Sequence, residues 1–124
     1  MVHLIEPQHL FVPALIDVFT EAGLFVDFVS AQIDPRKLLD DQPHLVFLDT
    51  DFIDEPLENI RLAHILAPGA QIYVYSSDTN DAISRAFMAA GADIVLKKSA
   101  ERRHIVQSLH EVERRRRQRH LHDR

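Results

Sequence analysis

Four polar residues that could do chemistry together stand at the ends of short apolar runs in this sequence. They are Glu6, Asp49, Ser76 (or its neighbour Ser77) and Lys98. A carboxylate, a hydroxyl and an ammonium group that converge suit phosphoryl transfer, because catalysis of that reaction is mainly positioning and charge neutralisation. Asp49 would attack phosphorus, while Lys98 and Ser76 would contact phosphoryl oxygens. The sequence therefore predicts a phosphoacceptor site, provided that the fold brings these residues together.

The runs that precede these residues have the length and composition of buried strands. In the stretch HLVFLDTD, residues 44–51, four apolar residues stand between Pro43 and a group of acids. This pattern is typical of a strand that is buried on both faces, as in a parallel sheet. By the same criteria five strands are predicted, over residues 2–5, 24–29, 45–48, 71–75 and 94–96.

Helical spacing of apolar residues separates these strands. Pro13 fits a first helix only if that helix begins near His9, because proline belongs in the first turn. Asp34 and Pro35 are an N-cap and a first helical residue, and they open a short second helix. The predicted helices cover residues 9–22, 34–41, 57–67 and 82–90, and a last one begins near Ser99 and buries its apolar face as far as Val112.

Five rounds of strand then helix predict an α/β fold, a three-layer sandwich with a parallel sheet between helices. All strands of such a sheet end at the same edge. Open α/β sheets place their ligand and reaction sites at that edge. The predicted fold therefore gathers Glu6, Asp49, Ser76 and Lys98 at one place.

Charge divides the sequence into two parts. Residues 1–100 have a net charge of −9, whereas residues 101–124 have +4, with five arginines among residues 114–119. An acidic body argues against nucleic-acid binding by the domain itself. We therefore expect one domain over residues 1–112, followed at 113–124 by a basic helix end or a linker to an output domain beyond Arg124.

Composition excludes several other classes of protein. There is no cysteine, so neither disulfides nor thiolate metal sites nor a thiol nucleophile can occur. No apolar run is long enough to span a membrane and the N-terminus lacks a secretory signal, so a cytoplasmic location is expected. Six histidines, His3, His9, His44, His64, His104 and His110, show no ligand spacing and are interpreted as surface or hydrogen-bonded residues.

The order and spacing of the four polar residues resemble the receiver domain of bacterial two-component response regulators, over residues 1–112. The segment GADIVLKKS, residues 91–99, is the most specific part of the resemblance. It implies a flavodoxin-like fold with strand order 2-1-3-4-5. It also implies phosphorylation of Asp49 by a histidine kinase or phosphotransfer protein with Mg²⁺, with Ser76 and Lys98 in the site. The phosphorylated domain would be a switch and not a turnover enzyme, acting through a helix 4, strand 5, helix 5 surface that also forms a homodimer.

The sequence departs from that family at the expected metal site. Receivers usually carry two adjacent acids after the first strand, but here Pro7 replaces the second. We expect Mg²⁺ binding to be weakened and to rest on Glu6, Asp49 and Asp51, the last of which could supply a carboxylate from another direction. The usual aromatic switch residue is also replaced, by Val95.

Two alternative functions are open, the first because of Pro7 and the second because of the motif LDTD. In the first, the chain is a degenerate receiver that works as a dimerisation or docking module without phosphorylation. In the second, the Asp-x-Asp form of LDTD belongs to a haloacid dehalogenase-type phosphatase, with Asp49 as nucleophile and Asp51 as general acid. Simpler roles also exist: Ser76 could cap the following helix, and Glu6 could bind the start of the first helix.

Overall fold

The computed structural model describes residues 1–78 and 80–122, and the side chains of residues 1–78 and 80–119. Within these residues, strands and helices alternate as the apolar pattern predicts. The strands are β1 (Val2–Ile5), β2 (Phe28–Ser30), β3 (Leu45–Asp49), β4 (Gln71–Ser76) and β5 (Ile94–Lys97). The helices are the 3-10 turn η1 (His9–Phe11), α1 (Val12–Glu21), α2 (Pro35–Asp41), α3 (Pro56–Leu66), α4 (Asp81–Ala90) and α5 (Arg102–His122).

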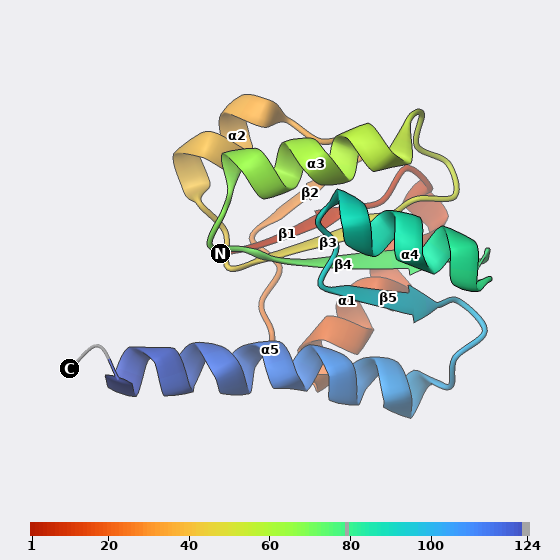
Figure 1. The fold of residues 1–124 in the computed structure, drawn as a ribbon. Helices are drawn as coiled ribbons and strands as arrows, with labels where there is room; N and C mark the ends of the chain where they lie inside the picture. Colours follow the sequence, from red (N-terminus) through yellow and green to blue (C-terminus); the bar gives the residue numbers. More distant parts are fainter. Residues whose placement is uncertain (79, 123–124) are drawn as a thin grey trace.

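The five strands form one parallel sheet in the order β2-β1-β3-β4-β5, which confirms the predicted fold class and strand order. Figure 1 shows the three layers: α2, α3 and α4 cover one face of the sheet, and α1 and α5 cover the other. β3 lies in the middle, paired with β1 and β4. Asp49, the last residue of β3, is therefore held at the centre of the carboxyl edge.

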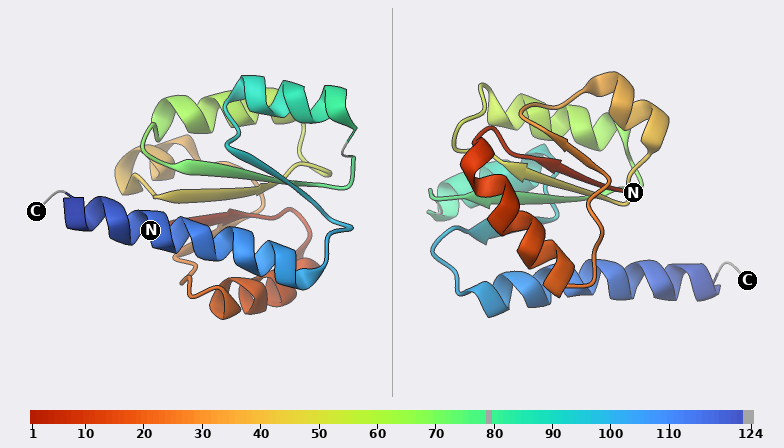
Figure 2. Two further views of the ribbon diagram at one scale, coloured as in Figure 1. Left: turned by 60° about the horizontal axis from the view of Figure 1, so that its bottom comes forward. Right: turned by 180° about the vertical axis from the view of Figure 1, so that it is seen from behind.

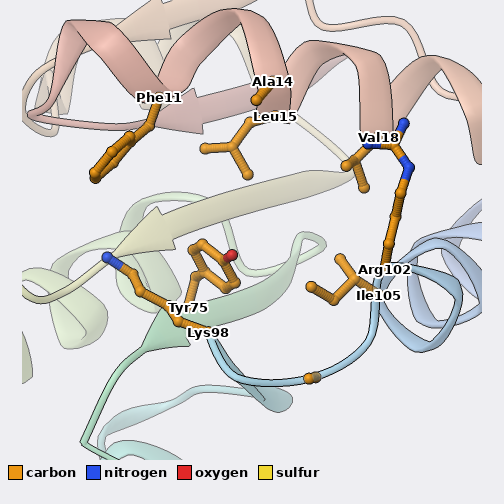
Figure 3. A pocket seen from close by; sticks show the side chains of 9 residues that line it. Phe11, Ala14, Leu15, Val18, Tyr75, Lys98, Arg102 and Ile105 are labelled. Carbon is orange, nitrogen blue, oxygen red and sulfur yellow. The ribbon is translucent and has the colours of Figure 1, made fainter.

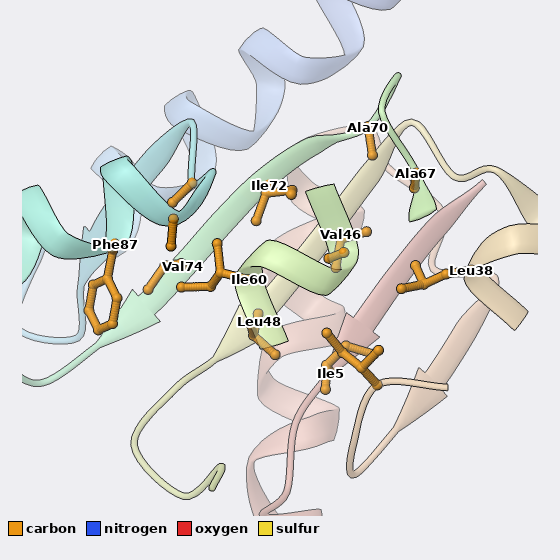
Figure 4. Close-up of a cluster of buried hydrophobic side chains, with 14 residues drawn as sticks. Ile5, Leu38, Val46, Leu48, Ile60, Ala67, Ala70, Ile72, Val74 and Phe87 are labelled. Atoms are coloured by element: carbon orange, nitrogen blue, oxygen red, sulfur yellow. The ribbon is translucent and has the colours of Figure 1, made fainter. Parts of the chain in front are cut away.

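Alternate residues of β3 supply the two cores. Val46 and Leu48 face α2, α3 and α4, and Figure 4 shows them packed among the buried side chains of that layer. Leu45 and Phe47 face α1 and α5. All four are fully buried, and burial of each such side chain contributes about 1.5–3 kcal/mol. This burial on both faces explains why β3 reads as a continuous apolar run.

Local signals set several helix ends. Pro13 lies in the first turn of α1, and the Asp34 carboxylate accepts a hydrogen bond from the Lys37 amide over 3.1 Å, as an N-cap does. Gly91, just after α4, has φ +128°, and a Cβ there would lie 2.8 Å from His64 of α3. Glycine thus lets α3 and α4 approach closely.

The prediction of strand two over residues 24–29 was wrong in its bounds. β2 covers only Phe28–Ser30. Leu24 is buried, but its amide closes the end of α1 by donating to the Phe19 carbonyl. Its apolar character therefore reflects packing beneath the end of a helix and not strand pairing.

The last helix also differs from its prediction. It begins at Arg102 instead of near Ser99, because residues 97–100 form a turn in which the Ala100 amide donates to the Lys97 carbonyl. It then continues through Val112 without a break, to His122, and Figure 2 shows it running past the sheet. The predicted basic end, 113–124, is helical as far as it is described; residues 123–124 lie outside the described part.

None of the helices within the described residues combines the length and the apolar character that a membrane span needs.

Candidate functional site

Asp49 and Lys98 form the centre of the site at the carboxyl edge. The Asp49 side chain is wholly buried, and Lys98 Nζ donates a hydrogen bond to its Oδ2 over 2.7 Å. The Lys98 amide also donates to the carbonyl of Ser76, which extends the pairing of β4 with β5 and points the lysine across the strand ends. Hydrogen bonds between charged groups are stronger than neutral ones. The structure thus brings the predicted acceptor and lysine into direct contact.

Asp51 is a second partner of the same lysine. Its Oδ2 lies 2.8 Å from Lys98 Nζ, and its Oδ1 accepts from the Ser77 amide over 3.1 Å. Burial acts to raise the pKa of Asp51, but the hydrogen bonds from Lys98 and Ser77 outweigh it and lower that pKa below its usual value. A carboxyl that stays ionised is poorly suited to act as a general acid. This counts against the phosphatase alternative.

The Ser76 hydroxyl lies at the edge of the site and is also bonded to its own loop. Ser76 is buried at the end of β4, with Oγ 3.4 Å from Asp51 Oδ1 and 3.0 Å from the Asp78 carbonyl. Ser77 is exposed; its amide donates to Asp51 Oδ1, and its side chain also helps to lower the pKa of Asp51. The N-cap of α4 is Asn80, whose Oδ1 accepts from the Ile83 amide over 2.9 Å. Capping therefore does not explain Ser76.

Glu6 lies against Asp49 from the end of β1. Its side chain is 1% exposed, and Oε2 accepts from the Gln8 amide over 3.0 Å, so it does bind the start of η1. Oε1 is buried and has no hydrogen-bond partner within the described residues. Burial, together with the adjacent Asp49 carboxylate, raises the pKa of Glu6 to about 7. Glu6 therefore changes between its protonated and ionised forms near neutral pH.

The site has more carboxylates than cations. Glu6, Asp49 and Asp51 surround one ammonium group, that of Lys98. Burial acts to lower the pKa of Lys98, but hydrogen bonds to Asp49 and Asp51 raise it above its usual value, so the lysine stays charged. The excess negative charge favours a cation at this edge.

The carboxylates of this site can hold Mg²⁺, but with only a few ligands from the protein. Their donors are carboxylate oxygens, which Mg²⁺ prefers, and Glu6 Oε1 is unpaired beside Asp49. Both oxygens of Asp51 are already engaged, and Pro7 offers no ligand through its side chain. Within residues 1–78 and 80–122, no three His, Cys, Asp or Glu side chains form a ready metal site. Mg²⁺ commonly binds through one or two carboxylates and several waters, which is what Glu6 and Asp49 could offer.

Three aromatic rings surround Lys98, a feature that the sequence did not predict. Its Nζ lies 5.8 Å from the ring centre of Phe11, 5.4 Å from Phe52 and 5.3 Å from Tyr75. Contacts between a cation and an aromatic face stabilise the charged form and hold its position. The only signal in the sequence was two large aromatic residues, Phe11 and Phe52, in segments that flank the predicted strand ends.

A cavity of about 370 Å³ opens beside Lys98, between α1 and α5. Figure 3 shows Lys98 and Tyr75 on one side of it and Leu15 of α1 opposite, while Arg102 spans its far end. The Arg102 Nε bonds Glu21 Oε2 over 2.9 Å, so an ion pair joins α5 to α1 there.

The histidines stay apart from this site. His3 is buried and its Nε2 lies 2.9 Å from Asp41 Oδ2, so it is a hydrogen-bonded residue, as interpreted from the sequence. His44 Nδ1 lies 3.0 Å from the amino nitrogen of Met1 at the opposite edge of the sheet.

Comparisons with known proteins agree on the fold. No protein-family model and no curated protein sequence matches the chain. Among solved structures, a two-component response regulator of the LuxR family from Aurantimonas sp. SI85-9A1 is 17% identical, with 90% of this chain and 82% of that chain covered and a TM-score of 0.81. A CheY-like receiver domain protein from Methanospirillum hungatei JF-1 is 20% identical, with coverage of 92% and 96% and a TM-score of 0.70. A protein described as related to pilus assembly, from Burkholderia pseudomallei K96243, is 17% identical, with coverage of 90% and 87% and a TM-score of 0.75.

The chain thus has the fold of response-regulator receiver domains, the class to which its sequence resemblance pointed. The predicted site residues Glu6, Asp49, Asp51, Ser76 and Lys98 all lie in one cluster at its carboxyl edge. Their chemical roles remain predictions.

Proposed function

We propose that this chain is a signal-transduction receiver that accepts a phosphoryl group on Asp49. The observation that carries the proposal is the hydrogen bond of 2.7 Å between Lys98 Nζ and the buried Asp49 carboxylate, with the Ser76 hydroxyl in the same cluster. In this site one carboxylate attacks, one ammonium group neutralises charge and one hydroxyl binds a phosphoryl oxygen.

In the proposed reaction, an Asp49 oxygen forms a bond to phosphorus while the bond from phosphorus to the donor group breaks. Lys98 shifts from the carboxylate to a phosphoryl oxygen. The Ser76 hydroxyl gives up its hydrogen bond to the Asp78 carbonyl and donates to another phosphoryl oxygen. Because Lys98 is held by Asp51 and by three aromatic rings, it stays near the reacting group during this exchange. Negative charge that arrives with the phosphoryl group is thereby neutralised in place.

We place Mg²⁺ beside Glu6 and Asp49, where it would neutralise phosphoryl oxygens. Glu6 must be ionised to hold the metal, and its pKa of about 7 makes Mg²⁺ binding stronger above neutral pH than below it. With Pro7 in place of a second acid, this binding is weak.

The proposed partner that supplies the phosphoryl group is a cytoplasmic histidine kinase or phosphotransfer protein. Phosphorylation would draw Ser76 and the loop after β4 toward Asp49 and bias a surface on α4, β5 and α5. We propose that this surface signals, through a homodimer or through an output domain that follows α5.

A second candidate is the docking module that works without phosphorylation. It is favoured by the ion pairs that Lys98 makes with both Asp49 and Asp51, which stabilise the cluster without any metal. In that case the same fold would bind its partner in one fixed state.

Intact-protein mass after incubation with a small-molecule phosphodonor tests the proposal. We expect a phosphoryl adduct that needs Mg²⁺ and is lost in Asp49→Ala. Asp54→Ala, in the exposed loop after β3, is the matched control and keeps the adduct. No adduct at any Mg²⁺ concentration would contradict the proposal and favour the docking module.

A further inference from the structure

A second cluster of polar groups lies at the amino edge of the sheet, opposite the phosphoacceptor site. Here α5 passes the start of β3 and β4, and a small cavity of about 40 Å³ lies between them. One wall of this cavity is formed by His44, Gln71 and the loop residue Gly69. The other wall is formed by three arginines of α5, Arg115, Arg116 and Arg119. None of these residues takes part in the proposed phosphorylation.

Two buried polar atoms at this cavity have no hydrogen-bond partner within the described residues, His44 Nε2 and Gln71 Oε1. The amino nitrogen of Met1 donates to His44 Nδ1, so the ring hydrogen is on Nε2, which is a donor. Burial is the main cause that lowers the pKa of His44 to about 4, which keeps the ring neutral at neutral pH. Leaving a buried donor unpaired is unfavourable, because it loses its hydrogen bonds to water without replacement. A bound group that accepts from Nε2 would remove that cost.

The arginines give this cavity its charge. Positions 112, 115, 116 and 119 fall on one face of α5, so Val112 anchors the helix while the guanidinium groups beyond it reach the cavity. Arg116 is paired with Glu113 over 2.8 Å, whereas Arg115 and Arg119 form no ion pair within the described residues. Guanidinium groups bind phosphate oxygens through two parallel hydrogen bonds.

We propose that His44, Arg115 and Arg119 form a binding site for a phosphate group at the amino edge. The cavity holds a few non-hydrogen atoms, which suits a phosphate and not a whole nucleotide. Gln71 can take part because rotation of its terminal amide places NH₂ where Oε1 now lies. A phosphate bound here would join the far end of α5 to the sheet, and so fix the direction in which that helix leaves the domain.

The test is a titration of the full chain with inorganic phosphate, against chloride at matched ionic strength. The readout is the NMR signal of the His44 ring, assigned with His44→Gln. We expect a saturable shift, which Arg115→Gln/Arg119→Gln weakens by roughly tenfold or more, the size expected for lost charged hydrogen bonds. The matched control is Arg114→Gln/Arg117→Gln, which removes the same charge from the same turns but does not line the cavity.

Two results would overturn the proposal. One is the absence of a saturable shift up to tens of millimolar phosphate, which would mean that water alone fills the cavity. The other is an equal loss in both double variants, which would reduce the effect to the general charge of α5. A short DNA duplex then identifies the source of the phosphate: tighter binding that falls steeply with salt assigns the site to nucleic acid, and saturation by phosphate alone assigns it to a small anion.

Discussion

The two edges of the same sheet carry opposite charge, and they acquire it in different ways. At the carboxyl edge, Glu6, Asp49 and Ser76 end or follow strands, so the parallel arrangement itself brings them together. At the amino edge, the positive charge comes from α5, which continues past the sheet. The carboxyl-edge site therefore depends on where the strands end, whereas the amino-edge charge depends on α5 being long enough to reach that edge.

Charge is also compensated differently at the two edges. Asp49 is wholly buried and depends on Lys98, which is itself mostly buried. On α5 the guanidinium groups of Arg114 and Arg116 are about half exposed, and they form ion pairs with Glu111 and Glu113 one turn away. A buried charge depends strongly on its partner, while an exposed pair contributes little. Substitutions at the carboxyl edge are therefore expected to change stability far more.

The largest effect is expected for Lys98→Met. It leaves the Asp49 and Asp51 carboxylates without their cation, and we expect the free energy of unfolding to fall by roughly 2–4 kcal/mol near neutral pH. Urea denaturation measures this. The matched control is Lys97→Met, at the exposed end of β5, which is expected to change stability little. A loss of equal size in both variants would contradict the role of Lys98 as the cation of a buried cluster.

The next effect concerns Glu6 and pH. Its pKa is about 7 in the folded chain, whereas an unperturbed glutamate, as in the unfolded chain, has a pKa of 4.5, so the folded state binds the extra proton between these values. Stability therefore falls as pH rises from about 4.5 through 7, and the penalty, at most about 3 kcal/mol, is complete above that. Glu6→Gln is expected to stabilise the chain at about pH 8.5 and to leave it unchanged at about pH 4. Urea midpoints that shift equally at both pH values would exclude this titration.

Pro7→Asp is expected to raise Mg²⁺ affinity about tenfold, because it adds a carboxylate next to Glu6. Calorimetric titration with Mg²⁺ measures the change. Pro7→Asn supplies the same backbone without the charge, so it separates the added ligand from the loss of proline. If both variants bind Mg²⁺ as the natural chain does, the metal does not lie beside Glu6.

The smallest effect is expected at the amino edge, for Arg116→Gln. Arg116 is half exposed, whereas its partner Glu113 is buried and has a second cation, Arg117, with Nε 3.4 Å from Oε1. Because Arg117 can take over the pairing with Glu113, we expect the free energy of unfolding to fall by less than about 1 kcal/mol. A change as large as that of Lys98→Met would remove the contrast between the two edges.

Much of the fold and of the site could be predicted from the sequence because strand ends are visible in it. The run before Asp49 marks a central strand, and parallel strands must end together, so the meeting of Asp49 with Lys98 follows from order alone. The bounds of β2 could not be predicted, because the apolar side chain of Leu24 packs under the end of α1 and the residue does not pair as a strand. Periodicity does not separate those two causes.

Contacts between side chains of different segments also could not be predicted from the sequence. The metal role of Asp51 stays a prediction, but the contacts of its oxygens with Lys98 and with the Ser77 amide were not foreseen. The rings of Phe11, at the end of η1, and of Phe52, in the loop after β3, lie beside Lys98. Spacing along the chain carries no information on such contacts, since each depends on the path of a loop.

The central claim is that Asp49 itself carries the phosphoryl group, and locating the modified residue tests it most directly. After phosphorylation with and without Mg²⁺, borohydride reduces an aspartyl phosphate to homoserine, and peptide mass spectrometry finds its position. We expect homoserine at position 49 alone, and only with Mg²⁺. Homoserine at position 51, or at no position, would contradict the claim.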